Sequence, residues 1–324
     1  MKITVLDMDT AAIGNDISFN CMHEFGELNV IGQTDDFRTA EFIGDSDVVI
    51  CNKSRITREV MELCPNLKYV NTMGTGFDQI DIEAADKRGI TVCNIPAYST
   101  DAVAQHTIAL ILNYYCKISE YAADTLNGGW TEKKYFAVFG RPTYELAGKT
   151  IGLIGCGDIG KKVARIADAF GMNVLAYNRN PDKLQGIPYI NCVPLEELLR
   201  QSDIVSIHAP LNEHTRELIN RDTLAMMKNS ALLVNTARGG IINEADLAEA
   251  LNSEKIAAAA VDALTVEPMT GDTPLRGAKN LTITPHAAWS PIETRQRMVQ
   301  AVYENLKGFI HGTPQNVVNR KINT

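Results

Sequence analysis

The sequence lacks the features that mark disulfide-stapled, membrane-spanning or nucleic-acid-binding proteins. Its 7 cysteines are scattered and form no C-x-x-C pair, which argues against a disulfide framework and a thiolate metal site. No stretch stays apolar for the roughly 18 residues that a membrane-spanning helix needs. Acidic residues outnumber basic ones, 39 to 31, and the net charge of -8 argues against nucleic acid as a partner. We therefore expect a protein of a reducing compartment without a resident metal.

The composition that remains is typical of a globular enzyme. The chain has 324 residues, more than one hydrophobic core usually organises, so we expect two domains. Hydrophobic residues make up 45% and charged residues 22% of the chain, which is enough for a sizeable core. The N-terminus opens at once into a strand-like run without the basic and apolar regions of a signal peptide. This predicts a cytoplasmic protein.

Short runs rich in Val and Ile alternate with helix-like stretches along the whole chain. This pattern predicts an α/β fold in which parallel sheets are covered on both faces. A first series of strands is expected at residues 3–7, 28–32, 47–51, 67–71 and 90–93. A second series is expected to begin at Ile151 and to continue at residues 173–177, 203–207, 231–235, 258–262 and 281–284. Two sheets are therefore predicted, one in each half of the chain.

Two helices are predicted outside these series. Residues 100–119 read as one long helix with apolar positions at Ala104, Ile108 and Ile111, and it links the two sheets. Residues 291–310 read as another helix, after which no further strands follow. Because the ends of a domain usually lie close together, we expect this tail to pack back on the first domain.

A glycine-rich turn follows the strand that begins at Ile151. Residues 155–160 read G-C-G-D-I-G and precede a helix-like stretch, which is the setting that a dinucleotide-binding turn requires. Gly155 allows the tight turn, Gly157 lets a pyrophosphate approach the backbone, and Gly160 lets helix and strand pack closely. The alternative is a turn that is merely rich in glycine, but its place between strand and helix favours a nucleotide.

The end of the next strand bears on the choice of dinucleotide. Dinucleotide folds usually place an acid there for the adenosine ribose, but this chain has Asn178 and Arg179. Without a carboxylate the repulsion against a 2'-phosphate disappears, and Arg179 offers that phosphate a guanidinium fork. The sequence thus favours NADPH over NADH. The alternative is that Arg179 is a solvated residue or stacks on the adenine.

Three charged residues stand at the carboxyl ends of later strands, the edge where α/β proteins bind ligands. Arg238 follows one strand within N-T-A-R-G-G, Glu267 precedes a proline after the next, and His286 lies in T-P-H-A-A-W after the last. An arginine can bind a carboxylate as a fork, a histidine can exchange a proton, and a glutamate can orient the imidazole. Each residue alone is as easily an ordinary surface group. Together, beside a dinucleotide turn, they indicate a catalytic set.

The other histidines carry weaker signals. His208 ends a strand as I-H-A-P and either borders the cofactor through its backbone or is structural. Four more read as structural. His106 lies inside the predicted linking helix, His214 lies in a polar loop, and His23 and His311 lack partners in the pattern.

These motifs together resemble the D-isomer-specific 2-hydroxyacid dehydrogenase family over nearly the whole chain. The resemblance implies that Arg238 binds the substrate, that His286 donates the proton and that Glu267 pairs with this histidine. The fold it implies is a Rossmann-type cofactor domain of residues 100–290 plus a flavodoxin-like substrate domain of residues 1–99 and 291–324, with a cleft between them. Residues 94–105 and Trp289 look most like the glycerate dehydrogenases, that is, the hydroxypyruvate or glyoxylate reductases.

The resemblance also implies further binding residues. Substrate would be bound by Arg238 and by four residues of the first domain, Lys53, Gly74, Thr75 and Gly76. For Lys53, a solvated lysine without a role in binding is an equal alternative. The cofactor set would include the motif residues Gly155, Gly157, Asp158, Ile159, Gly160, Asn178, Arg179, His208, Ala209, Pro210, Thr215, Thr236, Ala237, Arg238, Asp262, His286 and Ala288. The implied reaction is reversible hydride transfer between NAD(P)H and C2 of a small 2-oxo acid.

Two other functions compete with this interpretation. A dinucleotide-sensing binding protein, like the corepressors that resemble this family, would use the same fold without turnover. Formate dehydrogenase is a second enzyme alternative, but it calls for another partner than Glu267 for the histidine. The family resemblance also predicts a homodimer, with residues 100–119 and the aromatic segment 128–139 as the contact region.

Overall fold

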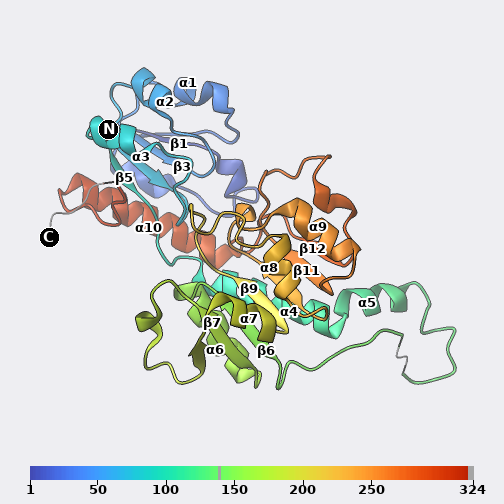
Figure 1. Cartoon of the computed structure of the whole chain (residues 1–324). Coiled ribbons are helices and arrows are strands. Elements are labelled where there is room, and N and C mark those ends of the chain that lie inside the picture. Colours follow the sequence, from blue (N-terminus) through green and yellow to red (C-terminus); the bar gives the residue numbers. More distant parts are fainter. Residues whose placement is uncertain (138–139, 320–324) are drawn as a thin grey trace. The chain divides into compact units, whose positions relative to one another are not determined.

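The computed structural model describes residues 1–137 and 140–319 of the chain. It divides into two compact units, of which the first comprises Met1–Ser99 and the chain from Trp289 onward, and the second Thr100–Ala288 (Figure 1). Each unit has one parallel sheet with helices on both faces. The predicted α/β class is therefore confirmed.

The first unit is built on five parallel strands in the order β2-β1-β3-β4-β5, as in flavodoxin-like folds. All five lie where the runs of Val and Ile predict them. Their bounds are β1 (Lys2–Val5), β2 (Glu27–Val30), β3 (Val48–Cys51), β4 (Tyr69–Thr72) and β5 (Thr91–Cys93).

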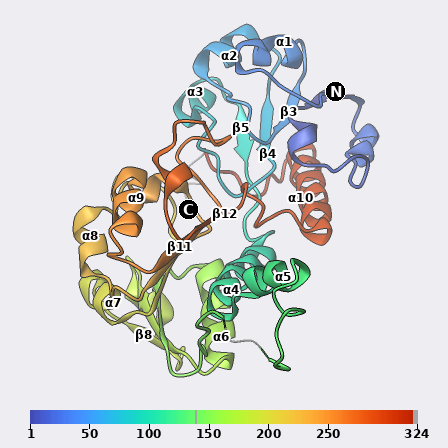
Figure 2. The same cartoon turned by 90° about the vertical axis from the view of Figure 1, so that its right-hand side faces the viewer.

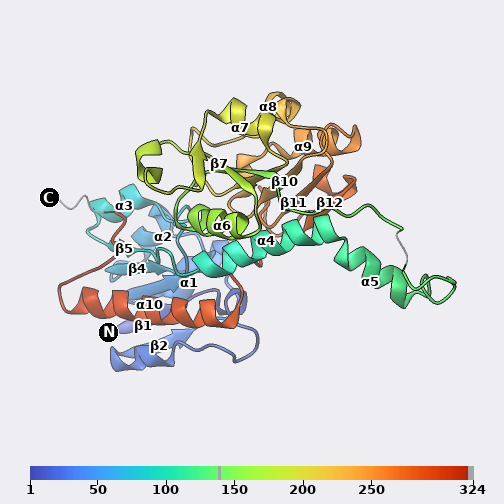
Figure 3. The same cartoon turned by 90° about the horizontal axis from the view of Figure 1, so that it is seen from below.

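Helices cover the two faces of this first sheet unequally. Three short helices pack on one face, and one long helix lies along the other (Figure 3). The short helices are α1 (Thr39–Ile43), α2 (Arg58–Leu63) and α3 (Ile82–Lys87), and the long one is α10 (Ile292–Ile310). Met298, Val302 and Leu306 of α10 are fully buried against strand residues such as Ile3 and Val48. The C-terminal helix thus completes the core of the first unit.

The second unit has seven parallel strands in the order β12-β11-β10-β9-β6-β7-β8. Six of them lie at the predicted positions: β6 (Thr150–Ile154), β7 (Asn173–Tyr177), β9 (Ile204–Ile207), β10 (Leu232–Asn235), β11 (Ala258–Val261) and β12 (Leu281–Ile283). The prediction missed β8 (Ile190–Cys192), a short edge strand with no buried residue, so its sequence carries no apolar run. The order reverses between β6 and β9, and such a switch point is where dinucleotides bind in these folds.

The helices of the second unit form a layer on each face of its sheet (Figure 2). One layer is α4 (Thr100–Cys116) with α6 (Asp158–Ala169), and the other is α7 (Leu195–Gln201), α8 (Arg221–Met226) and α9 (Glu244–Asn252). Ala104, Ile108 and Ile111 of α4 are buried in the first layer, as the sequence predicts.

The predicted helix over residues 100–119 is wrong at its C-terminal end. The chain turns at Lys117, which has a left-handed φ of 54°, and a separate helix α5 (Ile118–Leu126) follows. The ammonium of Lys117 lies 3.9 Å from the centre of the Tyr114 ring, a cation–π contact that favours this turn. Among the described residues, no helix combines the length and apolar character needed to cross a bilayer.

Candidate active site of the second unit

The carboxyl ends of the parallel strands of the second unit share one edge of the sheet. Arg238 follows β10, Glu267 follows β11 and His286 follows β12, and these three strands are neighbours in the sheet. The glycine-rich turn follows β6 at the same edge. The sheet therefore brings all the charged residues that the motifs singled out in this unit to one side.

His286 and Glu267 form a direct pair. The Nδ1 atom of His286 lies 2.9 Å and 2.8 Å from the two carboxylate oxygens of Glu267. Each side chain is 27% exposed. An ionised carboxylate only accepts hydrogen bonds, so Nδ1 carries the hydrogen in this pair. The second ring nitrogen, Nε2, is thereby left as the atom that can exchange a proton.

The backbone around His286 is held by a buried carboxylate at the end of β11. Asp262 is 2% exposed, and its two oxygens accept the N–H groups of Ala287 (2.8 Å) and Ala288 (2.9 Å). Its backbone oxygen accepts the N–H of His286 at 2.8 Å. His286 itself has a left-handed φ of 54°, a conformation that costs energy for a residue with a side chain. The bonds to Asp262 hold the histidine in this conformation.

Arg238 lies in a loop that is fixed by a buried amide. The side chain of Asn235, fully buried at the end of β10, accepts the N–H of Ala237 (3.0 Å) and donates to the backbone oxygen of Arg238 (2.9 Å). Both bonds are internal to the turn, so the backbone of Arg238 is set independently of any ligand. The arginine is half-buried, which strengthens its attraction for an anion relative to a solvated guanidinium.

The Arg238 and Glu267 loops touch each other at a glycine. A Cβ atom on Gly239 would lie 1.9 Å from the carbonyl carbon of Leu264, so no other residue fits there. The N–H of Leu264 donates to Glu267 at 3.1 Å, and the N–H of Thr265 donates to Glu244 at 2.6 Å. The position of Glu267 therefore depends on the Arg238 turn and on the first residue of α9.

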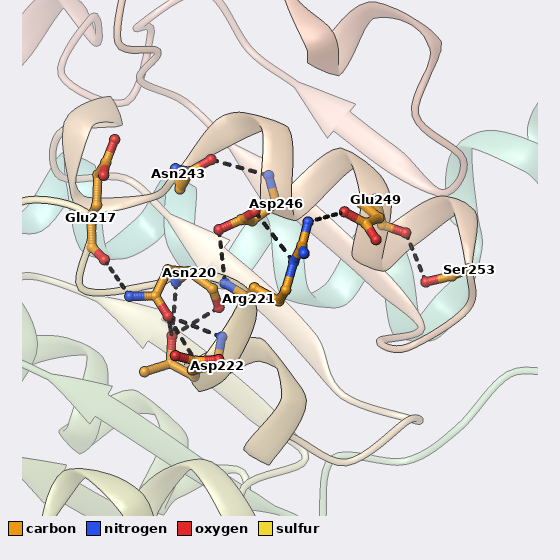
Figure 4. Close-up of polar contacts among 9 residues, drawn as sticks. Glu217, Asn220, Arg221, Asp222, Asn243, Asp246, Glu249 and Ser253 are labelled. Atoms are coloured by element: carbon orange, nitrogen blue, oxygen red, sulfur yellow. Dashed lines mark hydrogen bonds and ion pairs between the residues drawn. The ribbon is translucent and has the colours of Figure 1, made fainter.

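Helix α9, which supplies Glu244, is itself fixed to α8 by a polar cluster (Figure 4). Asn243 caps α9 by accepting the N–H of Asp246 at 3.1 Å. The carboxylate of Asp246 accepts the backbone N–H of Arg221, the first residue of α8, at 2.9 Å, and the Arg221 guanidinium binds Glu249 at 2.6 Å. The two helices thus form a stable base for the Glu267 loop.

The glycine-rich turn has the geometry that a pyrophosphate needs. Gly155 has a left-handed φ of 86°, and a Cβ there would lie 2.8 Å from the backbone nitrogen of Ala209. No described atom lies within 4 Å of the Cβ position of Gly157, so this glycine opens the turn. A Cβ on Gly160 would lie 2.5 Å from the oxygen of Gly155, so this glycine permits close packing of helix and strand. The surroundings of Gly155 and Gly160 agree with the tight turn and the close packing inferred from the sequence, and the pyrophosphate contact of Gly157 stays a prediction.

The start of α6 adds an electrostatic reason to bind an anion here. Gly157 is the N-cap of α6, and as a glycine it supplies no capping side chain. Amide N–H groups and the positive end of the helix dipole therefore face the turn, with Asp158 and Ile159 in the first helical positions. The turn and the helix start together fit the pyrophosphate of a dinucleotide.

Asn178 at the end of β7 joins the glycine turn to the following loop. Its side-chain oxygen accepts the N–H of Cys156 at 3.4 Å, and its side-chain nitrogen donates to the oxygen of Asn180 at 2.6 Å. Arg179 is exposed. A neutral amide thus stands beside the glycine turn, next to an accessible cation.

His208 follows β9 at the switch point. Its Nε2 atom lies 3.0 Å from the hydroxyl of Ser206, and loss of solvation lowers the pKa of the imidazole to about 4. The ring is therefore neutral at pH 7. The chain continues through Ala209 and Pro210 to Thr215, whose hydroxyl donates to the oxygen of Pro210 at 2.6 Å. This loop is held by an internal hydrogen bond and lies at the strand end where the cofactor is predicted to bind.

The substrate-binding residues predicted from the first half of the chain all belong to the first unit. Lys53 is exposed after β3, and its backbone N–H donates to Asp7 at 2.9 Å. Gly74, Thr75 and Gly76 follow β4, and this turn is tied to the chain after β5 because the Thr75 hydroxyl donates to the backbone oxygen of Ile95 at 2.8 Å. Their roles stay predictions.

Sequence reasoning missed two features of the site. Asp262 was expected only beside the cofactor, but its carboxylate holds the His286 segment. His106, interpreted from its pattern as structural, places Nε2 3.1 Å from the hydroxyl of Thr284, two residues before His286. A signal was present for Asp262, since a carboxylate that ends a strand reading A-A-A-V must be buried and must find donors.

Comparison with known proteins agrees with this arrangement. Residues 108–288 match the family model described as "D-isomer specific 2-hydroxyacid dehydrogenase, NAD binding domain". A hydroxypyruvate reductase of Blautia hydrogenotrophica is 40% identical over 99% of this chain and 100% of its own length. A glyoxylate reductase of Aeropyrum pernix is 41% identical over 83% of this chain and 81% of its own.

A solved structure extends the comparison to the fold. An acyclic imino acid reductase, in complex with NADPH and D-Arg, matches with a TM-score of 0.86 and 32% identity, over 98% of this chain and 100% of that one. Sequence and fold therefore agree. The chain belongs to the D-isomer specific 2-hydroxyacid dehydrogenase family.

Proposed function

We propose that this enzyme reduces hydroxypyruvate or glyoxylate, in a reversible hydride transfer between NAD(P)H and C2 of a small 2-oxo acid. The reaction class follows from the family and from relatives that are named hydroxypyruvate reductase and glyoxylate reductase. The observation that carries the proposal is the His286–Glu267 pair, next to the Arg238 loop and at the same sheet edge as the glycine turn.

His286 is the proposed acid and base. Glu267 accepts from Nδ1, which orients the ring and leaves Nε2 to act on the substrate. In reduction Nε2 donates a proton to the oxygen on C2, and in oxidation it takes that proton back. His286 thus exchanges one proton at Nε2, while Glu267 keeps the ring oriented.

Arg238 is proposed to hold the substrate carboxylate. A guanidinium offers two parallel N–H groups to a carboxylate, which fixes the orientation of the neighbouring carbon as well as binding the charge. In the first unit, Lys53 and the turn of Gly74, Thr75 and Gly76 are proposed as further substrate ligands. Small 2-oxo acids present the carboxylate and the reacting carbonyl on adjacent carbons, so one arginine can orient both.

A nicotinamide dinucleotide is the proposed cofactor, and it supplies the hydride when bound. The turn from Gly155 to Gly160 and the start of α6 would hold its pyrophosphate. The loops after β9, β10, β11 and β12 supply the remaining proposed contacts, namely His208, Ala209, Pro210, Thr215, Thr236, Ala237, Asp262 and Ala288.

NADPH is the proposed preference over NADH. Asn178 and exposed Arg179 stand where an acid would repel a 2'-phosphate. A charge-assisted bond to that phosphate is worth about 1.5 to 3 kcal/mol, or roughly tenfold to hundredfold in affinity. Replacing Asn178 by Asp and Arg179 by Ser should reverse the order. A lower KM for NADH than for NADPH in the unmodified enzyme, at equal salt, would contradict the proposal.

A homodimer is the proposed assembly. Helix α5 and the chain after it extend away from the sheet of the second unit (Figures 1 and 3). Large apolar side chains are exposed there, including Leu126, Trp130, Tyr135 and Phe136, the last at 94%. Val138 and Phe139 of the predicted contact segment lie outside the described residues. A light-scattering mass of one chain at every concentration would exclude the dimer.

A steady-state assay tests the reaction against its alternatives. NADPH or NADH oxidation is followed with hydroxypyruvate, glyoxylate, pyruvate and larger 2-oxo acids, and formate with NAD(P)⁺ is the control for the second enzyme alternative. Turnover that is fastest with hydroxypyruvate or glyoxylate supports the proposal. Tight dinucleotide binding without turnover on any 2-oxo acid would instead favour a sensing protein, an alternative that none of the relatives described above supports.

A further inference from the structure

His106 lies on α4, outside the catalytic set, but it reaches the strand ends that carry this set. Its Nε2 atom is 3.1 Å from the hydroxyl of Thr284 and 3.5 Å from a carboxylate oxygen of Asp262. The His106 side chain is 24% exposed. A half-buried imidazole therefore contacts the segment that begins at Thr284 and leads to His286.

Counting donors fixes the direction of the bonds in this group. The hydroxyl of Thr284 lies 2.5 Å from Asp262 and donates its single hydrogen to the carboxylate. The same carboxylate oxygen also accepts the N–H of Ala287. Because the hydroxyl hydrogen is used, Thr284 can only accept from His106, so Nε2 of His106 carries a hydrogen. The bonds then run from His106 through Thr284 to Asp262.

The hydrogen bonds that run from His106 through Thr284 to Asp262 lead on to the backbone around His286. Asp262 accepts N–H groups from Ala287 and Ala288 and, through its backbone oxygen, from His286. A rotation of the Asp262 carboxylate would break its bonds to the N–H groups of Ala287 and Ala288, which fix the chain directly after the left-handed His286. Whatever fixes that carboxylate therefore fixes the catalytic histidine. Thr284 donates to Oδ1 of Asp262, and Nε2 of His106 lies 3.5 Å from the same oxygen. This oxygen also accepts the N–H of Ala287.

The next residue of α4 makes a parallel contact with the arginine loop. The hydroxyl of Thr107, fully buried, lies 2.9 Å from the hydroxyl of Thr236, two residues before Arg238. Consecutive side chains of one helix thus reach the segments of two of the three proposed catalytic residues, His286 and Arg238. This second contact shows that α4 is fitted to the strand ends as well as to the hydrophobic layer below.

We infer that His106 is a positioning residue for the dehydrogenase reaction: it donates to Thr284, fixes the Asp262 carboxylate and thereby holds His286 in place. The inference rests on the proposed function, since it assigns His106 a role in the same site. The contacts of His106 with Thr284 and Asp262 assign it an indirect role. Its effect should therefore appear in kcat, which depends on the orientation of His286, and much less in the KM for NADPH.

The first test removes and then restores the donor. His106→Leu lacks a donor, whereas His106→Gln keeps an N–H at similar reach. Gln105→Leu is the control, because Gln105 is the exposed neighbour on the same helix. We expect kcat to fall about tenfold in His106→Leu, to recover at least half of that loss in His106→Gln, and to stay unchanged in Gln105→Leu. Equal losses in His106→Leu and His106→Gln would overturn the inference.

A double-mutant cycle separates positioning from loss of packing. Thr284→Val removes the hydroxyl that transmits the bond, so His106→Leu should lower kcat by less than twofold in the Thr284→Val background. Full additivity of the two losses would show that His106 does not act through Thr284 and would overturn the inference. Thermal unfolding of each variant shows whether a drop in kcat follows a drop in Tm instead.

A measurement without cofactor or substrate tests the bond direction. NMR of the enzyme with ¹⁵N-labelled histidine reports which ring nitrogen carries hydrogen. We expect hydrogen on Nε2 of His106, and a neutral ring protonated only on Nδ1 would overturn the inference. The two proposals fail in different ways: a wild-type enzyme inactive on every 2-oxo acid defeats the proposed function, whereas an active enzyme indifferent to His106→Leu defeats only the positioning role.

Discussion

Asp7 in the first unit and Asp262 in the second are buried carboxylates with the same task. Asp7 follows β1, is 4% exposed and accepts the backbone N–H groups of Asn52, Lys53 and Ser54 at 3.1, 2.9 and 2.8 Å. Asp262 follows β11, is 2% exposed and accepts two such groups from the loop after β12. Each carboxylate holds the loop that follows a neighbouring strand, and each loop carries a predicted functional residue.

The two carboxylates differ in what else they bind. The remaining donor to Asp7 is the hydroxyl of Ser54, from the same loop, at 2.7 Å. The remaining donor to Asp262 is Thr284, which in turn binds His106 of another helix. Asp7 therefore closes one loop on one strand. Asp262 links a helix, a strand end and the proposed acid–base residue His286, so a change there should alter catalysis before it alters folding.

The largest effect should come from the residue that Asp262 holds. His286→Ala removes the proposed proton donor, and we expect kcat to fall about 10²- to 10⁴-fold with dinucleotide affinity nearly unchanged. In the unmodified enzyme, reduction needs the imidazolium and should fail toward alkaline pH, whereas oxidation needs the neutral ring and should fail toward acid pH. If the rates of reduction and oxidation fell in the same direction of pH change, His286 would not be the acid and base.

Exchanging the two carboxylates for amides tests the comparison directly. Asp262→Asn should lower kcat by about tenfold to hundredfold, because an amide nitrogen cannot accept the loop N–H groups. Asp7→Asn should instead lower the free energy of unfolding by about 1 to 3 kcal/mol. Steady-state kinetics and urea unfolding of both variants provide the measurements. If Asp262→Asn lost only stability, the two carboxylates would have the same static role.

The arginine loop is held by the buried amide of Asn235, and substitution of its arginine gives a smaller expected effect. Arg238→Lys keeps the charge but loses the planar fork, so both kcat and KM should worsen, by about tenfold to hundredfold in kcat/KM. The backbone of the turn is held by Asn235 and should not change. Full kcat/KM in Arg238→Lys would show that the substrate is not bound as a bidentate pair.

The sequence predicts the strand ends better than the contacts between them. Parallel strands rich in Val and Ile are recognisable, and their carboxyl ends share an edge, so Arg238, Glu267 and His286 can be grouped from sequence. The contacts depend on side-chain geometry that no motif encodes. Neither the bonds of both Glu267 oxygens to one imidazole nor the approach of His106 from α4 follows from spacing along the chain.

Local breaks in helices and edge strands were the least predictable features of the fold. The turn at Lys117 has neither glycine nor proline to announce it, and it depends on a cation–π contact with Tyr114 and on a left-handed lysine. Strand β8 pairs only with β7 and is exposed or half-buried throughout. Features stabilised by one or two contacts leave no periodic pattern, whereas the core strands do.

The smallest expected effect is a difference between the two units in how their folding stability depends on pH. In the second unit, desolvation lowers the pKa of His208 to about 4, below its ordinary value of about 6.5. Between these values the unfolded chain binds the extra proton, so stability falls as the pH drops from about 6.5 toward 4. In the first unit, the bond from Arg295, at 2.6 Å, lowers the pKa of the Asp16 carboxyl. Its stabilising effect is present above the ordinary pKa and is lost only as the pH falls below it.

Acidification should therefore weaken the second unit in a higher pH window than the first. His208→Asn should flatten the loss of stability between about pH 6.5 and 4, because the substituted side chain binds no proton in either state. Asp16→Asn should leave that window unchanged and reduce, but not abolish, the loss below about pH 4, because Asp45 and Asp47 also have lowered pKa values. Urea unfolding at a series of pH values measures both variants, and NMR titration should show that the His208 ring protonates only well below its ordinary pKa. If His208→Asn left the slope between pH 6.5 and 4 unchanged, the imidazole would be accessible to protons in the folded state, and the neutral His208 assigned to the switch point would be wrong.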